Sequence, residues 1–236
     1  MTTLAAQIAD RRARVLDRIA AAAARAGRDA GAVTLVAVTK THPLATVRAA
    51  VEAGCRDLGE NRAQELAEKA DALPGEVRGG DVRWHAIGSL QRNKARDVAA
   101  HADLFHALDS PRLARALDAR AAEAGRVLDV LVQLNISGEA SKSGVAPDAA
   151  GDLVALADAC SHLRVVGLMG MAAPAETGAE AERVVRPAFR RLRAAFEASP
   201  VPLRELSMGM SGDFELAVEE GATLVRVGSA LFGTRG

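Results

Sequence analysis

Tyrosine is absent from the 236-residue chain, which also contains only one tryptophan and two cysteines. Cys55 and Cys160 are far apart and form no Cys-x-x-Cys pair, so we predict two buried free thiols rather than a disulfide or a metal site. Free thiols are typical of a reducing compartment, and we therefore expect a cytoplasmic protein. No stretch has the length and apolarity of a transmembrane helix.

The chain also lacks a net charge, because 30 basic residues balance 30 acidic ones. A neutral protein has no broad positive field to attract a nucleic acid or an anionic membrane surface, so we expect a small-molecule partner. His101, His106 and His162 show no spacing with cysteine or acidic residues that is typical of a metal site, and we predict no bound metal. The composition is otherwise that of a globular protein, with 49% hydrophobic and 25% charged residues.

Short β-branched apolar runs alternate with Ala-rich stretches that carry Arg and Glu, a pattern typical of parallel βαβ units. The eight runs span residues 34–39, 57–60, 83–88, 104–109, 129–135, 163–170, 204–209 and 224–228. Helices are predicted between them, for example at 44–53 and 111–124, and apolar residues at a 3.6-residue period predict another helix within residues 1–27. No G-x-G-x-x-G motif follows the first run, which argues against an open nucleotide-binding sheet. We therefore predict a single domain over residues 1–236, an α/β fold that is a (β/α)8 TIM barrel with an extra N-terminal helix.

Lysine is scarce, since the chain has four lysines against 26 arginines. Lys40 directly follows the first apolar run, in VAVTKTHP, and barrels carry their functional groups at the carboxyl ends of their strands. Apolar walls behind an amine favour its neutral form, which condenses with an aldehyde. From this position alone, a Schiff-base lysine and a solvent-exposed lysine at a strand end are equal alternatives.

Small residues follow the seventh and eighth runs, in LSMGMSGD and VRVGSALFG. In barrels, the loops after these strands commonly bind a phosphate through free backbone N–H groups and the positive end of a short helix. Gly228 and Ser229 can supply such N–H groups, and Ser207 and Ser211 can add hydroxyl donors. Serine and glycine are also ordinary turn formers, so the motif alone does not establish a phosphate site.

A Schiff-base lysine and a phosphate site are the two groups that anchor a phosphorylated aldehyde, and pyridoxal 5′-phosphate has both. Arg226 lies two residues before Gly228, so strand alternation places the two on the same side of the sheet. If that side is the barrel interior, the guanidinium can meet the pyridine nitrogen and keep it unprotonated, which weakens the ring as an electron sink. A salt-bridged barrel arginine is the alternative.

Seven ordered blocks cover almost the whole chain: AVTKTHP at 37–43, DLGENRAQE at 57–65, WHAIGSLQRNK at 84–94, LNISGEASKSG at 134–144, GLMGM at 167–171, LSMGMSGDFELAVEEG at 206–221 and VRVGSALFGTR at 225–235. They resemble the pyridoxal phosphate homeostasis proteins (the YggS or PROSC family), relatives of the alanine racemase N-terminal barrel. The resemblance implies that Lys40 forms the internal aldimine. It further implies a phosphate site made by Ser207, Ser211, Gly228 and Ser229, and a ring site made by Asn61, His85, Met169 and Arg226. Arg62, Ala86 and Ser89 depart from the family pattern without touching these anchors.

The resemblance also implies a protein that holds pyridoxal 5′-phosphate for vitamin B6 homeostasis or delivery, with transient contacts to apo-enzymes. Alanine racemases pair the Schiff-base lysine with a tyrosine on the opposite face of the substrate, and this chain has no tyrosine. His85 is the best substitute base, although a structural hydrogen-bonding role is the alternative. We therefore predict that the chain is not an enzyme. The alternatives are a racemase-like enzyme that uses the cofactor on amino acids and a cofactor-free Schiff-base lyase.

Two further expectations concern release of the cofactor and assembly. Lys142, in the Gly/Ser-rich loop after the fifth run, is a candidate second amine that accepts the aldehyde during release, with a solvated loop lysine as the alternative. The chain ends a few residues past the eighth run, so we expect no racemase-type second domain and predict a monomer.

Overall fold

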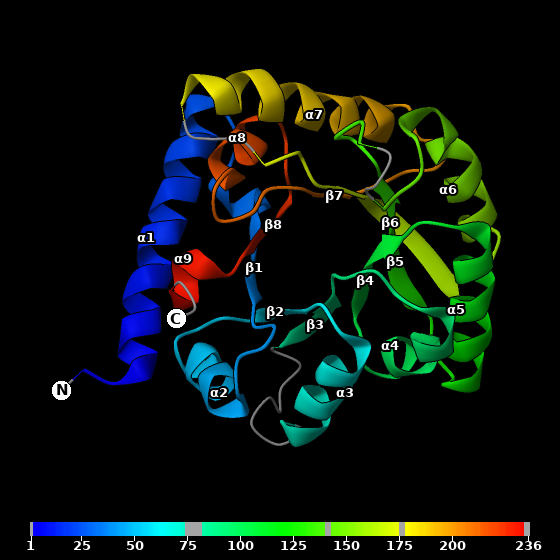
Figure 1. The fold of residues 1–236 in the computed structure, drawn as a ribbon, viewed down its shortest axis with the longest axis horizontal. Helices are drawn as coiled ribbons and strands as arrows, with labels where there is room; N and C mark the ends of the chain where they lie inside the picture. The colour runs from blue at the N-terminus through cyan, green and yellow to red at the C-terminus, as the bar shows by residue number, and fades with distance from the viewer. Residues whose placement is uncertain (1, 74–81, 140–142, 175–177, 234–236) are drawn as a thin grey trace.

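The computed structural model describes residues 2–73, 82–139, 143–174 and 178–233. Parallel strands form a closed barrel in sequence order, with the last strand pairing back on the first, and helices surround it (Figure 1). The strands are β1 (Thr34–Val38), β2 (Asp57–Glu60), β3 (Arg83–Ala86), β4 (Leu104–Leu108), β5 (Leu128–Leu134), β6 (Leu163–Gly170), β7 (Glu205–Ser207) and β8 (Leu224–Val227). The predicted (β/α)8 barrel is therefore confirmed.

The helices follow the strands around the outside of the barrel. The α-helices are α1 (Leu4–Arg25), α2 (Leu44–Glu52), α3 (Ala63–Ala72), α4 (Ala95–His101), α5 (Pro111–Glu123), α6 (Ala150–Asp158), α7 (Ala179–Glu197), α8 (Phe214–Glu219) and α9 (Ser229–Phe232). Short 3-10 helices are η1 (Ala30–Ala32), η2 (Arg92–Lys94) and η3 (Pro147–Ala149). Local sequence explains the sharp starts: the Ser110 hydroxyl accepts a hydrogen bond from the Leu113 N–H at 3.4 Å, and Pro111 occupies the first helical turn of α5.

Two predicted strands end earlier than the apolar pattern indicates. The runs at 83–88 and 204–209 continue two residues beyond β3 and β7. Gly209 adopts a φ of 92°, in the left-handed region, which a strand cannot accommodate. These extra residues form turns at the carboxyl end of the barrel instead.

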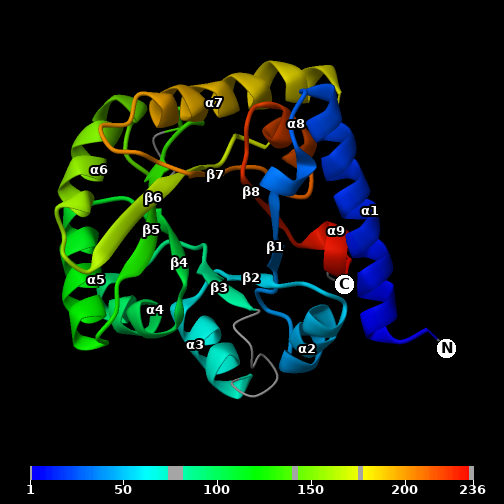
Figure 2. The same cartoon turned by 180° about the vertical axis from the view of Figure 1, so that it is seen from behind.

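The extra helix α1 lies along α8 and α9, outside β1 and β8 (Figure 2). Its buried stripe includes Ile8, Val15 and Ile19, as the 3.6-residue period predicts. Arg18 donates to the Glu215 carboxylate at 2.9 Å, and its guanidinium lies 4.5 Å from the centre of the Phe214 ring. The N-terminal helix therefore belongs to the helical shell of the barrel.

Three sequence expectations concern residues away from the barrel mouth. Cys55 is a buried free thiol, as predicted, but Cys160 is only partly buried because it follows α6 near the surface. Within the described parts of the chain, none of the helices has the length and apolarity needed to span a membrane. Lys142 lies outside the described residues.

Candidate functional site

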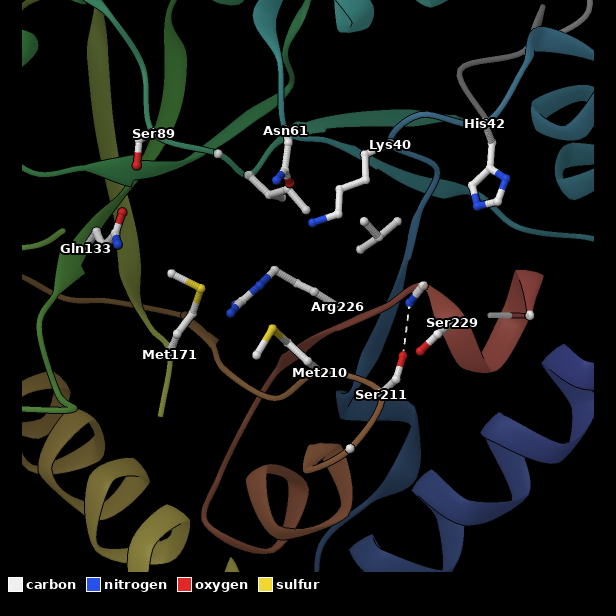
Figure 3. Close-up of a pocket in the computed structure, with 16 residues that line it drawn as sticks. Lys40, His42, Asn61, Ser89, Gln133, Met171, Met210, Ser211, Arg226 and Ser229 are labelled. Carbon is white, nitrogen blue, oxygen red and sulfur yellow. Dashed lines mark hydrogen bonds between the residues drawn. The ribbon is translucent and has the colours of Figure 1, made fainter. Parts of the chain in front are cut away.

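A cavity of about 460 Å³ opens at the carboxyl end of the barrel, lined from β1, β2, β3, β5 and β8 and from the segments after β6 and β7 (Figure 3). This volume lies in the range of sites that bind small molecules. The lining residues are Val38, Lys40, His42, Asn61, Ile87, Gly88, Ser89, Gln133, Met171, Met210, Ser211, Gly212, Arg226, Gly228, Ser229 and Gly233.

Lys40 occupies the position directly after β1. Its partly buried side chain points into the cavity, toward the space also reached by Asn61 and Arg226 (Figure 3). No described residue forms a hydrogen bond or an ion pair with its amine. The amine is therefore available to a ligand in the cavity.

Asn61 reaches the cavity because a glycine lies against its backbone. A Cβ atom on Gly88 would lie 2.2 Å from the carbonyl oxygen of Asn61, well inside van der Waals contact. Only glycine therefore allows the turn after β3 to approach the turn after β2 this closely. This contact joins the GEN and IGS segments of the sequence at one edge of the site.

Hydrogen-bond donors gather where the loop after β7 meets the start of α9. The Ser211 hydroxyl oxygen accepts from the N–H groups of Gly228 at 3.2 Å and Ala230 at 3.4 Å. Ser229 lies beside Ser211 in Figure 3, and a Cβ atom on Gly212 would meet open space. Hydroxyl and backbone N–H groups that converge on one concave surface fit a phosphate.

Arg226 projects from β8 into the barrel, which decides the alternation that the sequence left open. It is 4% exposed, and its guanidinium donates to the Ser207 hydroxyl at 2.5 Å and to the Gly170 carbonyl at 3.2 Å. Burial lowers the pKa of Arg226 to about 10, an effect that the Asp213 carboxylate opposes. The side chain therefore remains a cation at neutral pH and lies at the inner wall of the cavity.

A chain of hydrogen bonds continues from Arg226 through the barrel interior. Ser207 Oγ lies 3.0 Å from His106 Nδ1, His106 Nε2 lies 2.9 Å from His85 Nδ1, and His85 Nε2 lies 2.8 Å from Asp57 Oδ1. Arginine can only donate and a carboxylate can only accept, so Ser207 Oγ accepts from Arg226 and His85 Nε2 donates to Asp57, whereas the two inner hydrogen bonds take their direction from the tautomers of the rings. Burial holds the pKa of His106 well below its ordinary value, so this ring is neutral.

The cavity collects six of the nine predicted site residues: Lys40, Asn61, Ser211, Arg226, Gly228 and Ser229. Met169, Ser207 and His85 are instead buried within the barrel and do not line it. Ser207 and His85 serve the hydrogen-bond chain behind Arg226. Burial of His85 between two partners also removes the best candidate base from the cavity.

Among the lining residues with polar or methionine side chains, sequence reasoning did not find His42, Ser89, Gln133, Met171 and Met210. All of them lie at or just beyond the carboxyl end of a strand, so the barrel rule could have identified them as candidates. The residues present fit pyridoxal 5′-phosphate, because an amine, a phosphate-binding surface and a cationic guanidinium line one cavity. In the described segments, no group of three or more His, Cys, Asp or Glu side chains could hold a metal ion.

Comparison with known proteins agrees with this geometry. Residues 15–236 match the family model "Alanine racemase, N-terminal domain". A Pseudomonas aeruginosa protein named pyridoxal phosphate homeostasis protein is 46% identical over 232 residues, which cover 97% of this chain and 96% of the relative. An Escherichia coli protein of the same name is 41% identical and covers 97% of both chains.

Solved structures are also similar to this chain over most of its length. PipY of Synechococcus elongatus, solved with pyridoxal phosphate bound, is 36% identical, with a TM-score of 0.77 over 96% of this chain and all of PipY (100%). A Bifidobacterium adolescentis protein described as unknown is 40% identical and has a TM-score of 0.88 over 97% of this chain and 96% of that chain. Alanine racemase of Clostridium difficile, at 15% identity and a TM-score of 0.72, shares the fold over 93% of this chain and 56% of its own.

Proposed function

Because this chain belongs to the pyridoxal phosphate homeostasis protein family and carries the alanine racemase N-terminal domain, we propose that it binds pyridoxal 5′-phosphate covalently through Lys40 for vitamin B6 homeostasis. The neutral Lys40 amine adds to the aldehyde carbon, and the two amine hydrogens leave with the aldehyde oxygen as water, forming a carbon–nitrogen double bond. The observation that carries the proposal is that the amine and the phosphate-binding surface line the same cavity.

Different residues around Lys40 face the phosphate and the ring of the proposed ligand. Ser211, Gly228 and Ser229 form the phosphate side of the cavity, where the two hydroxyls and the Ser229 N–H are donors that no described residue uses. Asn61 lies at the opposite, ring side with Lys40. Arg226 faces the pyridine nitrogen with a group that can donate but not accept a hydrogen bond. Ser207 and His85 act through the hydrogen-bond chain behind Arg226 rather than by contact, and Met169 is buried in the barrel core.

The proposed role is binding and delivery rather than catalysis. A bound pyridoxal phosphate ring supplies an electron sink, which an arginine beside its nitrogen weakens. The chain has no tyrosine to act as a second base, and His85 is occupied by Asp57 and His106. His42 also lines the cavity, so exchange of the α-proton should be measured across a panel of amino acids in deuterated water. No exchange is expected, and exchange that disappears in Lys40→Ala would establish an enzyme instead.

The covalent site is tested by visible absorbance, borohydride reduction and peptide mapping of the protein mixed with pyridoxal 5′-phosphate. A reduced pyridoxyl phosphate group is expected on Lys40, with none on Lys94, a partly buried lysine that does not line the cavity. Labelling at another lysine, or labelling of Lys40→Ala equal to that of the parent, would contradict the assignment.

The proposal also covers localisation, oligomeric state and transfer of the cofactor. We propose a cytoplasmic monomer that transfers its cofactor to apo-enzymes by transient contact. The two free cysteines fit a reducing compartment. A light-scattering mass of twice the chain would exclude the monomer, and cofactor transfer no faster than from free pyridoxal 5′-phosphate would exclude direct delivery.

A further inference from the structure

Behind the cavity, a buried group of charged side chains surrounds the turn that carries Lys40. Lys69 of α3 is 6% exposed, and its ammonium donates to the Thr39 carbonyl at 2.8 Å, to Glu60 Oε1 at 2.7 Å and to Glu65 Oε1 at 2.7 Å. The Thr39 hydroxyl donates to the same Glu60 oxygen at 2.6 Å. Three acceptors use all three N–H bonds of the ammonium. Lys69 is therefore a fixed cation and not a second nucleophile.

These contacts reach the peptide groups on both sides of Lys40. On one side, the carbonyl of Thr39 is held by Lys69. On the other, the N–H of Thr41 donates to Glu65 Oε1 at 2.5 Å, the same oxygen that accepts from Lys69. The Lys69 ammonium and the Glu65 carboxylate therefore hold the backbone immediately before and after Lys40 through hydrogen bonds.

The turn needs this support because its backbone is strained. Thr41 has a φ of 64°, and it is the only residue other than glycine with a positive φ among those described. A β-branched residue seldom adopts this left-handed conformation, which persists only where the surroundings impose it. The Thr41 conformation directs the chain away from β1 while the Lys40 side chain enters the cavity.

We propose that Lys69 is a positioning residue for Lys40: through Thr39 and Glu65 it holds the turn that aims the Lys40 amine at the aldehyde carbon of the cofactor. The inference rests on the proposed function for the identity of the ligand and for its attachment to Lys40. Glu60 Oε2 is buried with no hydrogen-bond partner in the described structure, so Lys69 is also the cation that keeps this carboxylate stable in the interior.

The test compares covalent attachment with non-covalent binding. Lys69→Met combined with Glu60→Gln removes both charges of the buried pair together and leaves Glu65, which is 19% exposed, with the Thr41 N–H as its donor. Glu65→Gln is a milder variant that weakens the link to Thr41 while the Lys69–Glu60 pair remains. The matched control is Lys94→Met, since Lys94 lies at the start of α4, outside the cavity.

Two ligands distinguish an effect on covalent attachment from an effect on non-covalent binding. Visible absorbance measures the attachment equilibrium of pyridoxal 5′-phosphate, and calorimetry measures binding of 4′-deoxypyridoxine 5′-phosphate, which has the same ring and phosphate but no aldehyde. In both test variants we expect covalent attachment to weaken by roughly tenfold or more while affinity for the deoxy ligand stays within about twofold. The Lys94→Met control should match the parent for both ligands.

A measurement without cofactor completes the design. Trace reductive methylation with formaldehyde, followed by mass spectrometry, gives the reactivity of Lys40 relative to Lys94 in the apo-protein, and this ratio should change in both variants. Unchanged attachment and an unchanged ratio in variants that fold would overturn the positioning role. If the variants lost attachment of pyridoxal 5′-phosphate and affinity for the deoxy ligand in parallel, Lys69 would have a merely structural role. If the parent protein bound neither ligand, the proposed function would be contradicted, and the methylation ratio alone would test the positioning role.

Discussion

His85 Nδ1 lies 2.9 Å from His106 Nε2 at the centre of a barrel whose interior is polar along one line, from Arg226 to Asp57. Barrel interiors are usually filled by branched apolar side chains. Here the guanidinium at one end is a hydrogen-bond donor and the carboxylate at the other is an acceptor. The guanidinium itself is held in orientation by its hydrogen bonds to the Ser207 hydroxyl and the Gly170 carbonyl.

Protonation of His106 provides the first prediction. Burial lowers the pKa of His106 well below its ordinary value of 6.5, and the charges of His85, Arg226 and Arg83 lower it further. Above pH 6.5 the ring is neutral in both the folded and unfolded states, whereas below it only the unfolded chain takes up the proton. The free energy of unfolding should therefore fall with acidification by about 1.4 kcal/mol per pH unit from this group.

Urea unfolding between about pH 8 and about pH 5 checks this dependence. His106→Gln, which keeps an amide donor for His85 but cannot titrate, should flatten the slope by the contribution of one proton. Equal slopes for the parent and the variant would show that His106 becomes protonated in the folded state.

The second prediction concerns the contact between Gly88 and Asn61. In Gly88→Ala the new Cβ atom would meet the Asn61 carbonyl oxygen at 2.2 Å, so one of the two turns must move. We expect a loss of about 1–3 kcal/mol in the free energy of unfolding together with weaker cofactor binding. The matched control is Gly151→Ala in α6, where the nearest atom is 3.9 Å away and the change should be neutral or slightly stabilising. Equal stabilities of the two variants would contradict the steric argument.

The sequence alone predicts which loops surround this site better than it predicts which inward-facing side chains reach the cavity. Lys40, Gly228 and Ser229 are found because strand order and strand ends depend on local patterns of apolar and small residues. Whether an inward residue reaches the cavity depends instead on how far each strand rises into the barrel, which is set by the register between strands. Ser207 pairs with Met169 across β6 and β7, and both stay below the cavity, a relationship that no local pattern encodes.

The buried ion pair illustrates the same limit. In the sequence, Lys69 lies beside Glu65 and Glu68 and has the pattern of a solvent-exposed helix residue. Nothing in the sequence indicates that its side chain is buried beneath Thr39, with only 6% exposed. Its burial arises because α3 packs so that this side chain reaches the end of β1, 30 residues away along the chain. Contacts of this kind require the closed barrel.

The third prediction tests the phosphate-binding surface. Ser211→Ala removes the hydroxyl that meets the N–H groups of Gly228 and Ala230, whereas Ser89→Ala removes a hydroxyl on the opposite side of the same cavity (Figure 3). A hydrogen bond to a charged group contributes about 1.5–3 kcal/mol, so Ser211→Ala should weaken binding of pyridoxal 5′-phosphate by roughly tenfold or more. Binding of pyridoxal, which has no phosphate, should not change. An equal loss for both ligands, or for both variants, would place the phosphate elsewhere.

The fourth prediction concerns the protonation of the ring nitrogen next to Arg226. A guanidinium offers only donors, so it stabilises an unprotonated pyridine nitrogen, whereas the glutamine of Arg226→Gln offers a carbonyl oxygen that can accept from a protonated one. The ¹⁵N chemical shift of ring-labelled pyridoxal 5′-phosphate should therefore report an unprotonated nitrogen in the parent protein and a larger protonated fraction in the variant. His106→Gln serves as the control, because it alters the hydrogen-bond chain but leaves the guanidinium in place. A protonated nitrogen in the parent would show that Arg226 does not face the ring nitrogen, and the bound cofactor would then be a strong electron sink.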